Sequence, residues 1–133
     1  MANIGESLVG SWHLLSYAEM QGDKITGYPY GEAATGRIFY TAEGTMAAFL
    51  NHEALANTPP DEAASFDKVF CYAGDYSVKD DLVFHEIDNA SLPFVLGITL
   101  VRKIVSVSDQ KLVLEADIPG RDDAVWHLTW QRD

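Results

Sequence analysis

Apolar and polar residues alternate along most of the chain, which is the pattern of strands with one buried face. The opening segment, residues 8–17, has a Gly two residues before Trp12, and we expect the large indole to point inward and close one end of a sheet. By strict alternation, one face holds Trp12, Leu14, Ser16 and Ala18, and the other holds His13, Leu15 and Tyr17. Both faces carry apolar groups, so we expect both to be covered.

Seven further segments have the same strand character and are joined mostly by short turns. They are residues 36–41, 45–50, 69–78, 82–88, 97–107, 111–116 and 124–131. Residues 42–44 form a short connection of the kind that closes a hairpin. Between residues 51 and 67 the period of the apolar and polar pattern changes. There Pro59 and Pro60 precede an acidic turn, which predicts one short helix over residues 61–66, between the third and fourth strands.

Eight short strands joined by tight turns favour antiparallel pairing between neighbours in the sequence. Eight is also about the number that closes a barrel with room for one small ligand, and closure removes the exposed sheet edges. The pattern therefore predicts an all-β fold, an up-and-down antiparallel β-barrel of about eight strands, with residues 1–133 forming one domain. A two-sheet sandwich is the main alternative, although its crossing connections need longer links.

Four short motifs in a fixed order resemble a known family. They are Gly10-Ser11-Trp12, Tyr28-Pro29-Tyr30-Gly31, Thr35-Gly36-Arg37-Ile38-Phe39-Tyr40-Thr41 and Tyr72-Ala73-Gly74-Asp75-Tyr76. With them the chain resembles, over nearly its whole length, the lipocalin-like domain family of small bacterial and fungal β-barrel proteins.

The resemblance implies a closed antiparallel barrel with an interior cavity, and a late Arg, best matched by Arg132, packed over Trp12 at the closed end. The chain departs from the family after His85, where residues 92–95 replace a Pro-Asn-Trp-type turn. The family brings no single function with it. Related barrels in natural-product pathways include cyclases and isomerases that act on polyketide- or terpenoid-like substrates.

The charge of the chain narrows the range of partners. Nine Lys and Arg stand against 20 Asp and Glu, for a net charge of −11, which repels phosphate backbones and anionic membrane surfaces. Neither nucleic acid nor a membrane is therefore expected as a partner, and no segment reaches the roughly 18 apolar residues of a membrane span. The single Cys71 cannot form an intramolecular disulfide, which favours a cytoplasmic protein. The sequence does not decide between a monomer and a homodimer.

The spacing of the histidines gives no metal-binding motif. His13, His52, His85 and His127 lie far apart, without the spacing of zinc ligands. The chain also has no Gly-rich phosphate loop and no nucleophile elbow. We therefore expect no metal and no other cofactor.

His85 and Glu86 are the candidate catalytic residues. They are adjacent in a strand, so only one of them faces the interior. An inward His85 would share its face with Val83 and Ile87, and a neutral imidazole there suits general acid or base catalysis near neutral pH. An inward Glu86 would instead be a buried carboxyl with a raised pKa.

The candidate ligand-binding residues are mainly aromatic. They are Trp12, Tyr28, Tyr30, Tyr40, Tyr72, Tyr76, Arg102 and His127. Phenols in an apolar cavity can bind a flat apolar ligand and orient its oxygens. An inward Arg102 would pair with a ligand carboxylate or enolate, whereas an outward Arg102 would snorkel at the surface. His127 lies on the face opposite Trp126, and the sequence does not decide which of these faces points inward.

Two functions follow from a barrel of this kind. The first is the binding of a small hydrophobic molecule in the cavity. The alternative is a cofactor-independent cyclase or isomerase that acts on a polyketide- or terpenoid-like substrate, which needs orientation of the substrate and one proton-transfer group. A protein-interaction module is the weakest reading, because the strand pattern shows no long exposed apolar strip.

Overall fold

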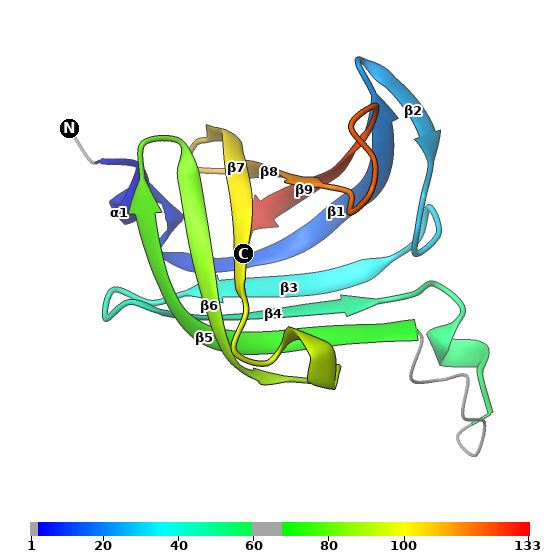
Figure 1. Ribbon diagram of the computed structural model, residues 1–133, viewed down its shortest axis with the longest axis horizontal. Coiled ribbons are helices and arrows are strands. Elements are labelled where there is room, and N and C mark those ends of the chain that lie inside the picture. Colours follow the sequence, from blue (N-terminus) through cyan, green and yellow to red (C-terminus); the bar gives the residue numbers. More distant parts are fainter. Residues whose placement is uncertain (1–2, 60–67) are drawn as a thin grey trace.

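The computed structural model describes residues 3–59 and 68–133, and its strands form one antiparallel sheet that closes on itself (Figure 1). The strands are β1 (Gly10–Gln21), β2 (Lys24–Gly27), β3 (Thr35–Tyr40), β4 (Thr45–Asn51), β5 (Val69–Lys79), β6 (Leu82–Ala90), β7 (Thr99–Val107), β8 (Lys111–Asp117) and β9 (Val125–Arg132). The helical segments are the α-helix α1 (Ile4–Leu8) and the 3-10 helices η1 (Leu55–Asn57) and η3 (Pro93–Val95).

Closure of the barrel comes from pairing between the first and last strands. β1 pairs with β3 and also with β9, so β1 and β3–β9 make the eight-stranded antiparallel barrel that the sequence predicts. β2 is an additional strand that pairs with the end of β1. The strand pattern did not indicate β2, since it is only four residues long and follows a polar turn.

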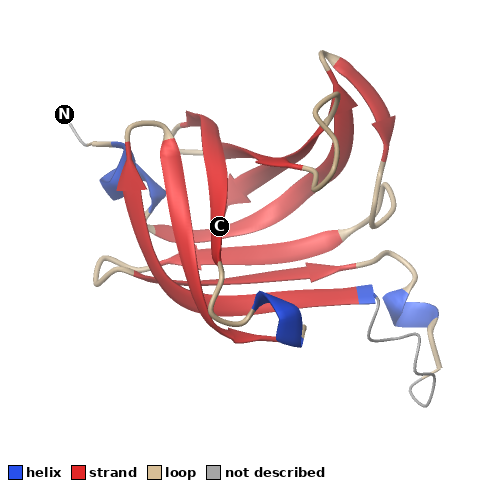
Figure 2. Cartoon of the chain, in the orientation of Figure 1, coloured by secondary structure: helices blue, strands red, loops and turns tan. Residues whose placement is uncertain are grey.

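The helical segments lie at the ends of the barrel, and strands form its wall (Figure 2). α1 lies at one end, and the side chain of Asn3 caps it by accepting a hydrogen bond from the backbone N–H of Glu6 at 2.8 Å. η1 and η3 lie toward the other end. The helix predicted over residues 61–66 falls outside the described residues.

A bulge in β1 changes which of its residues face the interior. The register between β1 and β9 shifts between Leu14 and Ser16, which inserts one residue and exchanges the two faces of the strand. Trp12 and Leu14 belong to the interior before the bulge, and Tyr17 lines the interior after it. The prediction that Tyr17 lies on the face opposite Trp12 is therefore wrong.

Trp12 closes one end of the barrel. Its side chain has no exposed surface, and its indole Nε1 donates a hydrogen bond to the carbonyl of Leu8 in α1 at 3.0 Å. The guanidinium of Arg132 lies 4.0 Å from the centre of the indole ring, which confirms the expected packing of these two residues. Arg132 also donates hydrogen bonds to the carbonyls of Ser7 and Val9. This one side chain therefore links β9 to α1 and to the residue that precedes β1.

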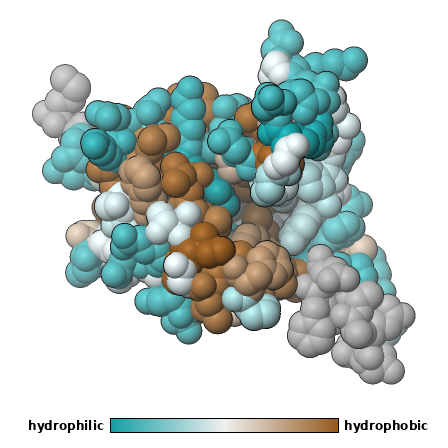
Figure 3. Space-filling model, in the orientation of Figure 1, coloured by the Kyte–Doolittle hydropathy of each residue, from teal (hydrophilic) through white to brown (hydrophobic). Residues whose placement is uncertain are grey.

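Hydrophobic side chains gather on one face of the molecule, over η3 and the first half of β7 (Figure 3). Phe94 in η3 is the most exposed of them, at 71%, and Leu96, Ile98 and Val101 follow it along the chain. No helix within residues 3–59 and 68–133 is long and apolar enough to span a membrane.

Candidate functional site

The barrel encloses a cavity of about 310 Å³ at the end away from Trp12. The volume is at the lower end of the range for small-molecule sites. Most of its wall is apolar and comes from inward positions of the strands and from the β2–β3 and β6–β7 connections. These residues are Pro29, Ile38, Ala48, Leu50, Phe70, Leu92, Leu114, Ala116, Trp126, Leu128 and Trp130.

A few polar side chains interrupt this apolar wall. They are Tyr17, Tyr30, Tyr72, His85 and Arg102. An apolar wall with a few converging polar groups is typical of sites that bind a hydrophobic molecule and fix its orientation.

His85 is held between two tyrosines. Its Nε2 hydrogen-bonds the Tyr40 hydroxyl at 2.7 Å, and its Nδ1 hydrogen-bonds the Tyr72 hydroxyl at 2.9 Å. The residue is only 1% exposed, between Val83 and Ile87 on the inward face of β6. Burial lowers the pKa of His85 from 6.5 to about 3, with a smaller effect from the Arg102 guanidinium, so the imidazole is neutral at pH 7.

The two tyrosines that hold His85 are neutral phenols. Burial raises the pKa of Tyr40 and of Tyr72, because the low-polarity interior disfavours a phenolate. The nearby Arg102 guanidinium opposes this rise in the pKa of both residues. At neutral pH, each hydroxyl therefore keeps a proton that it can donate.

Arg102 brings a positive charge to the cavity. It lies on β7, is half-buried and lines the cavity, on the face of the strand that also carries the interior residues Leu100 and Ile104. Its guanidinium donates to the backbone carbonyl of Val101 at 3.2 Å. Among the ion pairs within the described part of the chain, none involves Arg102.

The sequence matches one family model, that of the lipocalin-like domain, over residues 9–133. The chain belongs to the lipocalin-like domain family. No curated protein matches this lipocalin-like chain by sequence.

Solved structures share the barrel at low sequence identity. A lipocalin-like protein from Bacteroides uniformis superposes with a TM-score of 0.54 at 14% identity, over 96% of this chain and 99% of that one. The amine-binding protein of Rhodnius prolixus, in complex with tryptamine, gives 0.51 at 15% identity, over 99% and 66%. The bovine lipocalin allergen Bos d 2 gives 0.50 at 12% identity, over 98% and 75%. At these identities the likeness establishes a shared fold alone.

The lipocalin-like barrel brings four of the predicted site residues to the cavity wall. They are Tyr30, Tyr72, His85 and Arg102. Tyr40 lies behind this wall and contacts the site through its hydrogen bond to His85. The inward position of His85 places Glu86 on the outer face, where it is exposed, so Glu86 does not reach the cavity.

The other predicted site residues lie elsewhere in the lipocalin-like barrel. Trp12 is at the closed end, and Tyr76 donates a hydrogen bond to the Thr41 carbonyl at 2.7 Å, beside a wider, solvent-open hollow under α1. His127 pairs with Glu115 at 2.9 Å, on the face of β9 opposite Trp126. Tyr28 lies in the β2–β3 connection and does not line the cavity.

Four aromatic residues of the cavity were not among the predicted site residues: Tyr17, Phe70, Trp126 and Trp130. Tyr17 lines it because of the bulge in β1, and its ring contacts the rings of Tyr30 and Trp126. Trp126 and Trp130 line it because their face of β9 points inward. The alternating pattern of β9 places these two tryptophans on one face but does not show which way that face points.

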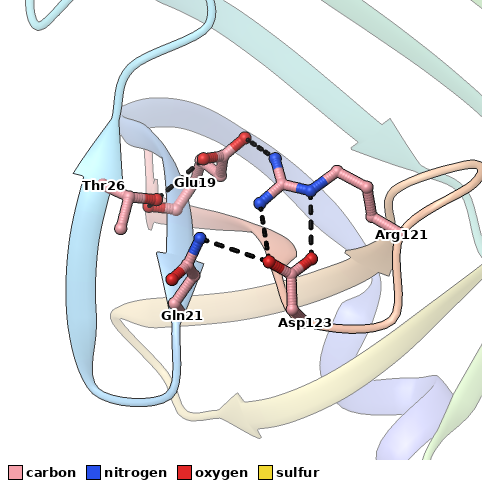
Figure 4. A network of polar contacts seen from close by, with 5 residues as sticks. All are labelled: Glu19, Gln21, Thr26, Arg121 and Asp123. Atoms are coloured by element: carbon pink, nitrogen blue, oxygen red, sulfur yellow. Dashed lines mark hydrogen bonds and ion pairs between the residues drawn. The ribbon is translucent and has the colours of Figure 1, made fainter.

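A polar network at the end of β1 ties β2 to the β8–β9 loop (Figure 4). Arg121 in that loop bonds Glu19 at 2.8 Å and Asp123 at 3.1 Å, and Glu19 accepts a hydrogen bond from Thr26 in β2. The network lies next to the cavity, since Glu19 is paired with Trp126 across β1 and β9. Ion pairs this exposed contribute little to stability.

Within the described part of the chain, no three His, Cys, Asp or Glu side chains gather in a way that would hold a metal ion.

Proposed function

We propose that the protein binds one small hydrophobic molecule inside the barrel. The observation that carries this proposal is the cavity of about 310 Å³, whose wall is mostly apolar and aromatic. The cavity does not extend to Trp12, which belongs to the packed core. The structure in which the amine-binding protein of Rhodnius prolixus holds tryptamine supports the idea that a barrel of this fold accommodates a small aromatic molecule.

The proposal also covers the cellular compartment of the protein and the chemical class of its partner. The single Cys71 and the excess of 20 acidic over 9 basic residues support a protein of the reducing cytoplasm whose partner is a small molecule. We also treat residues 1–133 as one barrel domain in this proposal.

The alternative function, a cyclase or isomerase, needs a group that exchanges a proton with the substrate. Both ring nitrogens of His85 are engaged by tyrosines, and Glu86 lies outside the barrel. The burial-lowered pKa of His85 also makes its imidazole a weak base. These observations favour binding over catalysis.

Filling the cavity is expected to weaken binding. Ala48 lines the cavity from β4, so Ala48→Phe places a ring where the ligand would lie. We expect the affinity for the neutral fluorescent probe N-phenyl-1-naphthylamine to fall at least about tenfold, which corresponds to ~1.4 kcal/mol. The measurement is a fluorescence titration of the wild-type protein and the variant, with thermal unfolding to confirm that each is folded.

Ala47→Phe is the matched control, because Ala47 is the next residue of β4 and lies on its outer face. It is expected to leave the probe affinity close to that of the wild-type protein. If Ala48→Phe fails to fold, Ala116→Phe makes the same test from β8. Equal affinities for a folded cavity variant and the outer-face control would contradict the proposed function.

A further inference from the structure

The hydrogen bonds of His85 determine what the cavity wall offers to a ligand. A neutral imidazole has one N–H donor and one acceptor nitrogen, so one tyrosine donates to His85 and the other accepts from it. Among the described residues, the only hydrogen-bond partner of the buried Tyr40 hydroxyl is His85. Tyr40 must therefore donate to Nε2, because otherwise its proton would be buried without an acceptor.

This assignment fixes the role of Tyr72. If Nε2 accepts from Tyr40, the proton of His85 is on Nδ1 and is donated to the Tyr72 oxygen, which lies 2.9 Å away. The Tyr72 hydroxyl then still has its own proton to donate. Tyr72 lines the cavity, whereas Tyr40 does not, so this O–H is available to a molecule bound there.

Arg102 adds further donors to the same wall. A guanidinium has five N–H groups, and Arg102 donates one of them to the Val101 carbonyl and also lies close enough to Tyr72 to oppose the rise in its pKa by hydrogen bonding. No described carboxylate lies within ion-pair distance of Arg102, although the chain has 20 Asp and Glu. The polar part of the cavity wall is therefore rich in donors and carries a positive charge.

We infer that the ligand is a small hydrophobic carboxylate whose anionic head accepts hydrogen bonds from Arg102 and Tyr72. This inference rests on the proposed function, because it names the class of molecule that the cavity binds. The apolar part of the ligand lies against the aromatic wall formed by residues such as Phe70 and Trp126. A cationic amine suits this site poorly, since no Asp or Glu is present among the lining residues to pair with it.

Three ligands with the same ring test the inference by competition with N-phenyl-1-naphthylamine at pH 7.5. They are 1-naphthaleneacetate, 2-(1-naphthyl)ethanol and 2-(1-naphthyl)ethylamine, which are anionic, neutral and cationic. We expect the carboxylate to bind about 10- to 100-fold more tightly than the alcohol, which is the range for hydrogen bonds to a charged group. The amine is expected to bind no better than the alcohol.

The source of the preference is tested by Arg102→Met, with Lys103→Met as the matched control. Both variants remove one positive charge from adjacent positions of β7, but Lys103 is exposed on the outside of the barrel. The ratio of carboxylate to alcohol affinity is expected to fall to about one in Arg102→Met and to stay at the wild-type value in Lys103→Met. If Arg102→Met does not fold, Arg102→Lys replaces it, because Lys keeps the charge without the planar guanidinium. Arg102→Lys is expected to give a ratio of carboxylate to alcohol affinity between one and the wild-type value.

The outcomes separate the two proposals. If the neutral probe binds and the carboxylate displaces it no better than the alcohol does, the carboxylate inference is wrong and the proposed function stands. A preference that survives in folded Arg102→Met also overturns the inference. If the neutral probe itself does not bind to the wild-type protein, the proposed function fails, and the inference fails with it.

Discussion

Trp12→Ala is expected to lower the free energy of unfolding by about 3–5 kcal/mol, which is the usual cost of truncating a buried Trp. The indole is fully buried under α1, and its removal leaves the Leu8 carbonyl without its donor. Since domains of this size have about 5–15 kcal/mol of stability, the variant should retain only part of the wild-type value. Urea denaturation at pH 7 measures the difference directly.

A double-mutant cycle separates the contact between Trp12 and Arg132 from the loss of volume. Trp12→Leu keeps an apolar side chain, and Arg132→Met removes the guanidinium that lies 4.0 Å from the ring centre. The coupling free energy between the two substitutions is expected to be about 0.5–2 kcal/mol. A coupling near zero would mean that Arg132 stabilises the barrel only through its hydrogen bonds to Ser7, Val9 and Asp109.

Trp12→Phe distinguishes closure of the barrel from a role in ligand binding. The sequence suggests Trp12 as a ligand contact, but the structure places it outside the lining of the cavity. We therefore expect Trp12→Phe to be destabilised and yet, while folded, to bind N-phenyl-1-naphthylamine with nearly the wild-type affinity. A folded Trp12→Phe variant that no longer binds the probe would contradict this expectation and show that Trp12 contributes to ligand binding.

The strands could be predicted well from the sequence, because alternation reports a buried face directly. The predicted segment 45–50 corresponds to β4 (Thr45–Asn51), and the segment 82–88 to β6 (Leu82–Ala90). The alternating pattern could not reveal the bulge in β1, since an inserted residue is defined by its pairing partner in β9. The pattern therefore places Trp12, which precedes the bulge, correctly in the core, but it puts Tyr17, which follows the bulge, on the wrong face.

The candidate site was only partly predictable for a related reason. Periodicity shows that His85 and Glu86 face opposite sides, and that Trp126 and His127 do too, but the inward side depends on how each strand joins the closed sheet. The partners of His85 come from β3 and β5, 45 and 13 residues away in the sequence. Their arrangement around one imidazole is a result of barrel closure, and no local motif encodes it.

Lowering the pH is expected to destabilise the protein partly through His85. An unfolded His takes up a proton near pH 6.5, whereas the buried His85 resists protonation until about pH 3. Between these values the unfolded chain binds more protons than the folded one, so the contribution of neutral His85 is intact above about pH 6.5 and is lost as the pH falls. The free energy of unfolding should decrease by up to about 1.4 kcal/mol per pH unit from this group.

His85→Gln isolates this contribution from that of the many carboxylates. The variant is expected to lose about 1–3 kcal/mol at pH 7, because the Tyr40 and Tyr72 hydroxyls lose well-placed partners. Its stability should nevertheless fall less steeply between pH 6.5 and 4, and denaturation in urea at several pH values measures both effects. His13→Gln, on the outer face of β1, is the matched control for the removal of one histidine. A His85→Gln variant with the full wild-type slope would mean that His85 is readily protonated in the folded barrel, and the donor role assigned to Tyr72 would then lose its basis.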